Sequence, residues 1–213
     1  MKNAIALAAV AGIATAAAAQ SGSLSIVASS NTIDSTLTTS FTLSVYGDAS
    51  VGTHITGAAF NMVASGGGMV TNMVADAGVA TWGGLGFEDQ GHTGGGNTGL
   101  VMGQIVFLPF IQPDAASALG NGPVLLGTFA VTIAADSVGV IDWSTAGGIG
   151  TFALEVIDVN SNPGGSPPGT YSPLGGAGDS AFDFGGVSVN IVPAPSAMAV
   201  LGLGGLVAGR RRR

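Results

Sequence analysis

The stretch that decides the fold is residues 40–46, which read Ser-Phe-Thr-Leu-Ser-Val-Tyr. Phe41, Leu43 and Val45 occupy every second position between hydroxyl-bearing residues, which is the pattern of a strand with one buried face. The same alternation recurs in residues 127–134, where Phe129, Val131 and Ile133 alternate with Thr128, Ala130 and Thr132, and in residues 151–159. The period is two, so the sequence predicts strands.

Working outward from this stretch, we expect further strands over residues 24–28, 55–64, 69–74, 79–82, 100–108, 138–143 and 182–192. The 37 glycines and nine prolines interrupt nearly every ten residues, as turns between short strands require. Residues 83–99, 119–123 and 160–178 are expected to be surface loops, with a short helical turn at 113–119. The sequence therefore predicts an all-β fold, a single β-sandwich of the jelly-roll type with about nine strands over residues 20–192.

Charge is distributed unevenly along the chain. Its five basic residues are Lys2 and Arg210, Arg211, Arg212 and Arg213, so residues 20–192 hold all twelve carboxylates and no lysine or arginine. Nucleic-acid binding requires cations that contact phosphate, and this segment has none. A Walker loop and a Schiff-base lysine are absent for the same reason. The lack of cysteine excludes disulfides and thiolate sites.

The first nineteen residues have the pattern of a signal peptide. Lys2 precedes an Ala-rich apolar run that ends in Ala17-Ala18-Ala19 and is followed by polar Gln20. We predict a signal helix over residues 1–19, cut by signal peptidase between Ala19 and Gln20. The alternative, a buried N-terminal helix, is less favoured because polar residues follow the run at once.

Residues 193–213 have the pattern of a second targeting signal. Pro193-Ala194-Pro195 precedes a thirteen-residue apolar run, 197–209, and the four arginines. As a helix this run spans about 20 Å, against about 30 Å for a bilayer core. We predict a short hydrophobic helix that holds the chain at the membrane transiently, with the arginines cytoplasmic and residues 20–192 outside.

This tail, Val-Pro-Ala-Pro-Ser-Ala-Met-Ala-Val-Leu-Gly-Leu-Gly-Gly-Leu-Val-Ala-Gly-Arg-Arg-Arg-Arg, resembles a PEP-CTERM sorting signal over the last 22 residues. The one departure is Ala194, where the family usually has Glu, which leaves open the sortase variant that reads it. The resemblance implies export, processing by an exosortase near Pro193–Pro195, and a destination at the cell surface or in extracellular polysaccharide.

Segments of the body resemble cohesin-like and carbohydrate-binding-module-like jelly rolls. The similarity rests on Gly57, Ala59, Phe60 and Met62 in one strand, and on Gly186, Val187 and Val189 in the closing strand. It implies a cohesin-like sandwich over residues 24–192.

Two groups of side chains are candidate ligand sites. Asp158, Asn160 and Asn162 place oxygen donors at alternate positions, as calcium loops do, although Pro163 and Gly169 exclude an EF-hand and the residues also suit a turn. The sequence indicates no cofactor other than calcium at this segment. Trp82, Trp143, Tyr46 and Tyr171 can stack on a sugar ring. We predict that Trp82, at a strand end beside Gly83-Gly84, and Tyr171, in the Pro-rich loop, are the exposed sugar-binding residues, and we assign Trp143 to the core.

Catalytic patterns are weak. Residues 87–92 combine Glu88, Asp89 and His92, but a solvated polar loop explains them better than a metal or acid–base site. There is no Gly-x-Ser-x-Gly elbow, and no motif selects a glycosidase carboxylate pair. We therefore expect a protein that is not an enzyme.

These observations favour an exported structural or adhesive protein of the cell surface or extracellular matrix, in contact with secreted polysaccharide or a surface protein. Three alternatives remain open, each with its own signature. A cohesin-like protein-binding module predicts an exposed apolar sheet face, a secreted carbohydrate binder predicts aligned aromatic side chains, and a secreted hydrolase predicts two carboxylates converging in a cleft.

The tail yields a direct prediction. Protein recovered outside the cell is expected to end near Pro193–Pro195 and to lack the arginines, and intact-mass measurement checks this. Replacing Arg210–Arg213 by Ser should leave the chain unprocessed and poorly retained at the membrane. Exported protein that still carries Arg213 would contradict the sorting signal.

Overall fold

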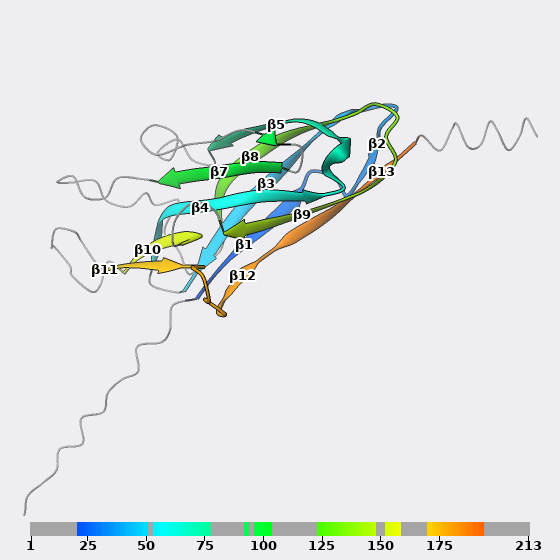
Figure 1. Cartoon of the computed structure of the whole chain (residues 1–213). Helices are drawn as coiled ribbons and strands as arrows, with labels where there is room; N and C mark the ends of the chain where they lie inside the picture. Colours follow the sequence, from blue (N-terminus) through cyan, green and yellow to red (C-terminus); the bar gives the residue numbers. More distant parts are fainter. Residues whose placement is uncertain are drawn as a thin grey trace, which may run out of the picture.

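The computed structural model describes residues 21–50, 53–77, 92–93, 96–103, 123–147, 152–158 and 170–193. These form two packed sheets, with one 3-10 turn, η1, at Gly67–Met69 (Figure 1). The strands are β1 (Gly22–Ala28), β2 (Thr32–Asp34), β3 (Ser40–Ala49), β4 (His54–Ser65), β5 (Val70–Ala77), β6 (His92–Thr93), β7 (Gly96–Gly103), β8 (Val124–Ile133), β9 (Gly139–Gly147), β10 (Leu154–Asp158), β11 (Thr170–Leu174), β12 (Phe182–Phe184) and β13 (Gly186–Val192).

The predicted signal helix at 1–19, the helical turn at 113–119, the strand at 79–82 and the hydrophobic helix of the tail lie outside the described residues. Among the residues that are described, no helix is long and apolar enough to cross a membrane.

The smaller sheet has the order β12-β1-β3-β8-β5, and its pairs are antiparallel except β1 with β12. The larger sheet is built around β4. β7 pairs with one side of β4, while β9 pairs with residues 60–65 and β10 with residues 54–58. β9 and β10 thus pair with successive segments of β4 and together take the place of one interrupted strand. β13 pairs with β9, and β11 pairs with β10.

The alternation that predicted the fold is confirmed. Leu43 and Val45 are fully buried and Phe41 nearly so, whereas the residues between them point outward. Two edge-to-face aromatic pairs join the sheets: Phe41 of β3 with Trp143 of β9, at 6.5 Å between ring centroids, and Phe60 of β4 with Phe129 of β8, at 6.4 Å. The prediction that Trp143 belongs to the core is therefore correct.

The single strand expected over residues 182–192 is wrong, because the chain changes sheet at Gly185. β12 pairs with β1 in the smaller sheet and β13 with β9 in the larger one. The Gly185 amide donates to the Leu24 carbonyl at 2.7 Å, and the Gly185 carbonyl accepts from the Thr145 amide at 3.2 Å. Gly185 is thus bonded to both sheets.

The first strands make the same crossing. β1 lies in the smaller sheet and β2 in the larger one, where β2 runs parallel to β13. β1 is also parallel to β12. The first two strands and the last two strands therefore pass from the smaller sheet to the larger sheet in the same direction and side by side. Ser21 and Pro193 therefore lie at opposite ends of the described body (Figure 1).

The expected strand count of about nine is too low, and the loop expected over 160–178 contains β11. The additional strands are short. β2 and β12 have three residues each and β6 has two, which is too few for a period of two to be recognised.

The sheet crossing predicts a sharp difference between two glycines. A Cβ on Gly185 would lie 2.5 Å from the Leu24 carbonyl oxygen, whereas one on Gly68 would meet nothing within 4 Å. Gly185→Ala should lower the free energy of unfolding by about 1–3 kcal/mol, because backbone must shift to relieve the clash. The control Gly68→Ala should change it by less than about 0.5 kcal/mol. Guanidinium melts of the two variants check this, and equal midpoints would contradict the close approach.

Candidate functional site

Most of the residues predicted to form sites lie outside the described part of the chain: Ala19, Gln20, Trp82, Asn160, Asn162, Ala194, Pro195, Arg210, Arg211, Arg212 and Arg213. Of the others, Pro193 follows β13 directly, and Asp158 and Tyr171 lie on β10 and β11. These two strands pair so that Asp158 faces Thr170 and Ile157 faces Tyr171. The structure thus brings the start of the predicted calcium segment beside one predicted sugar-binding residue, at the level of the backbone.

No group of three His, Asp or Glu side chains that could hold a metal ion occurs within the described ranges. Several carboxylates there have local structural roles instead. Asp34 accepts from the Thr36 amide at 3.0 Å, and Asp179 accepts from the amides of Gly175 and Ala181 at 2.9 and 3.0 Å. Asp142 accepts from the Ser188 hydroxyl at 2.5 Å. These contacts hold turns and neighbouring strands.

The outward face of the smaller sheet, called here the outer face, has a different composition. It includes the cross-strand row Ser25, Tyr46 and Leu125, from β1, β3 and β8, which adjoins the row of Asp183, Ser23 and Asp48 at one end of the sheet. Tyr46 and Leu125 are half-buried, so they contribute apolar surface at the level of the sheet. Val27 and Val74, which lie one and two rows farther along the sheet on β1 and β5, are 54% and 56% exposed. The outer face is completed by small residues, mostly hydroxyl-bearing: Ser23, Ser40, Thr42, Ser44, Thr128, Ala130, Thr132 and Asn72.

Charge on the outer face is confined to its borders. Ser23 pairs with Asp48 on one side and Asp183 on the other, at one end of the sheet, and Asp76 lies on the last strand. No lysine or arginine exists in this part of the sequence to balance them. A binding partner for the outer face therefore needs an apolar centre and cationic or hydrogen-bond-donating borders.

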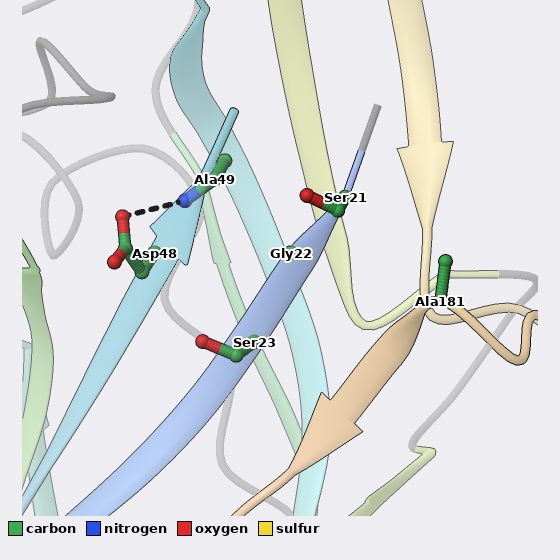
Figure 2. Close-up of a pocket in the computed structure, with 6 residues that line it drawn as sticks. All are labelled: Ser21, Gly22, Ser23, Asp48, Ala49 and Ala181. Carbon is green, nitrogen blue, oxygen red and sulfur yellow. Dashed lines mark hydrogen bonds between the residues drawn. The ribbon is translucent and has the colours of Figure 1, made fainter. Parts of the chain in front are cut away.

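A shallow pocket of about 210 Å³ lies where β1 begins, lined by Ser21, Gly22, Ser23, Asp48, Ala49 and Ala181. Figure 2 shows that its one carboxylate, Asp48, bonds the neighbouring Ala49 amide, at 2.9 Å. The Ser21 amide donates to the Ser50 hydroxyl at 2.7 Å. With one carboxylate already engaged locally, this pocket shows no pair of catalytic groups.

Tyr46 was not among the predicted site residues, although it is one of the four aromatic residues able to stack on a sugar ring. The signal was present, because Tyr46 follows Ser40, Thr42 and Ser44 on the outward side of the same strand. Its pairing with Leu125, 79 positions along the chain, depends on the fold.

The architecture is that of a two-sheet β-sandwich. Among solved structures, this sandwich is similar to cohesin modules. The chain is similar to the seventh ScaB type I cohesin of Pseudobacteroides cellulosolvens, with 10% identity and a TM-score of 0.50 over 80% of this chain and 93% of that one. It is also similar to the sixth cohesin of scaffoldin B from Acetivibrio cellulolyticus, solved with the Cel5 dockerin, with 12% identity and a TM-score of 0.48 over 81% and 99%.

A type III cohesin module from the ScaE cell-surface anchoring scaffoldin of Ruminococcus flavefaciens matches with 12% identity and a TM-score of 0.45 over 84% of this chain and 93% of that one. No protein-family model matches the sequence, and no curated protein does. At these identities the similarity is one of fold, and it confirms the expected cohesin-like sandwich.

The predicted calcium segment can be tested by stability. If Asp158, Asn160 and Asn162 bind calcium, millimolar calcium should raise the melting temperature above that in magnesium at matched ionic strength, because a ligand of the folded state stabilises it. Asp158→Ala should abolish the difference. Asp76→Ala, which removes the same charge from an exposed strand position, should retain it. Equal melting temperatures in the two ions would remove calcium as a ligand.

Proposed function

We propose that this chain is an exported, non-enzymatic protein of the cell surface or extracellular matrix whose jelly-roll sandwich is a protein-binding module. Export and transient membrane anchoring are inferred from the sequence at residues 1–19 and 193–213, with signal peptidase and an exosortase as processing partners. The binding role is supported by a fold similar to that of a cohesin and by the composition of the outer face.

The observation that carries the proposal is the uncharged apolar surface formed by the row of Ser25, Tyr46 and Leu125 together with the exposed Val27 and Val74 farther along the same face. Tyrosine is enriched at the energetic centres of interfaces because it provides large contact area with few rotatable bonds. Serine and threonine around it lose little side-chain entropy when a partner docks. An uncharged apolar surface with Asp48 and Asp183 at one end and Asp76 at one edge suits a folded partner with an apolar patch edged by Lys or Arg.

A protein partner explains this arrangement better than a sugar does. Sugar-binding faces need aligned aromatic rings, and Tyr46 is the one aromatic residue among those assigned to the outer face. A structural role within secreted polysaccharide then follows indirectly: the module would link a matrix protein to the chain that carries the sorting tail.

The outer face predicts where a partner will be cross-linked. A photoreactive phenylalanine analogue at Tyr46 in the producing cells should give a discrete higher-mass adduct, whereas the same analogue at Val140, 46% exposed on the larger sheet, should not. Val27→Lys should reduce the Tyr46 adduct at least about tenfold, as a buried interfacial charge is costly. The matched control Val140→Lys should leave the adduct unchanged.

An adduct at Val140 and none at Tyr46 would contradict the placement on the outer face. An adduct at Tyr46 that survives Val27→Lys would mark a chance encounter and would contradict specific docking. Exported protein with a correctly cleaved tail and no adduct at either position would contradict the binding role alone, leaving export intact.

A further inference from the structure

Among the described residues, β5 is an edge strand of the smaller sheet, and it lies close to β6 and β7 of the larger sheet. β5, Val70–Ala77, pairs along one side with β8, and in the described part of the chain no strand pairs with its other side. An unpaired edge presents a row of amide and carbonyl groups to any strand that approaches. β5 has eight residues, whereas β12, at the opposite edge, has three.

The sequence of β5 itself carries few of the features that protect an edge strand. Natural edge strands are blunted by lysine, proline, bulges or very short length. β5 reads Val-Thr-Asn-Met-Val-Ala-Asp-Ala, without lysine or proline. Its one irregularity in register falls between Val70 and Asn72, so the stretch from Asn72 to Ala77 is regular.

We propose that the β5 edge is the contact between two copies of this chain, which pair antiparallel about a twofold axis at Val74. The side chains of β5 are complementary to those of a second, antiparallel β5. In that register Val74 faces Val74 of the second copy, and Asn72 faces Asp76 of the second copy on both sides of the axis. All three side chains are exposed on the outer face.

Each of these pairs is favourable. Two valines more than half exposed to water would shield each other, and each Asn72 amide can donate to an Asp76 carboxylate. On the inner face, Met73 would lie opposite Ala75 of the second copy, which continues the apolar surface between the sheets. A register centred on Asp76 would instead oppose two carboxylates, which is unfavourable.

The absence of cysteine from the sequence makes a single-cysteine probe clean. Directly opposed residues of antiparallel strands have Cα atoms about 4.5–5.5 Å apart, within the range that a disulfide spans. In the full chain, Val74→Cys should convert most of the protein to a disulfide dimer under mild oxidation, as seen on a non-reducing gel. Val27→Cys, equally exposed on the same sheet and carrying the same chain ends, should stay monomeric. Equal cross-linking of the two variants would overturn the proposal.

Charge at Asn72 tests the register. Asn72→Lys should strengthen the dimer, since the introduced ammonium group would face Asp76 of the second copy, and Asn72→Asp should weaken it by placing two carboxylates together. Two symmetric pairs should change the dissociation constant roughly threefold to thirtyfold in each direction, measured by sedimentation equilibrium. Melting curves verify that both variants are folded. Shifts of the same sign, or none, would exclude this register.

Discussion

Apolar packing between the two sheets is the interaction on which the rest of this structure depends. Residues 20–192 contain no lysine, arginine or cysteine, so no disulfide and no lysine– or arginine–carboxylate pair can form within them. The sheets are instead joined by the contacts of Phe41 with Trp143 and of Phe60 with Phe129. Aromatic side chains bury about 150–250 Å² each, which makes these pairs large contributors to stability. Packing takes precedence over hydrogen bonding at Trp143, whose buried indole N–H has no hydrogen-bond partner among the described residues.

Several carboxylates of this acidic chain have a structural role. Apart from the predicted calcium segment, Asp34, Asp142 and Asp179 are engaged with hydroxyls and backbone amides close by. Short acidic side chains are good turn residues because they accept hydrogen bonds from nearby amides. Asp34 and Asp142 lie on strands of the larger sheet and Asp179 precedes β12, so none of the three adds charge to the outer face.

The sequence allowed the strand class and much of the core to be predicted, because alternation in β3 and β8 reports local geometry directly. The change of sheet at Gly185 was not predicted, although the apolar positions shift there by one residue, from Phe182 and Phe184 to Val187, Val189 and Ile191. The crossing depends on contacts with Leu24 and Thr145, which are distant along the chain. The same applies to the outer face. Tyr46 is outward by local pattern, but its neighbours Ser25 and Leu125 come from strands that only the fold brings together.

The proposed edge pairing and the proposed anchoring by the tail would constrain each other. Strands of the second copy run antiparallel to those of the first, so the two Pro193 ends of such a pair point in opposite directions along the strands. The twofold axis is perpendicular to the sheet, so both outer faces look the same way. Two copies held by their tails on one membrane would then have to lie flat, with the outer faces directed either toward that membrane or away from it. In the second orientation the pair presents two neighbouring docking faces to the exterior, and a partner with two sites gains from both at once through effective concentration.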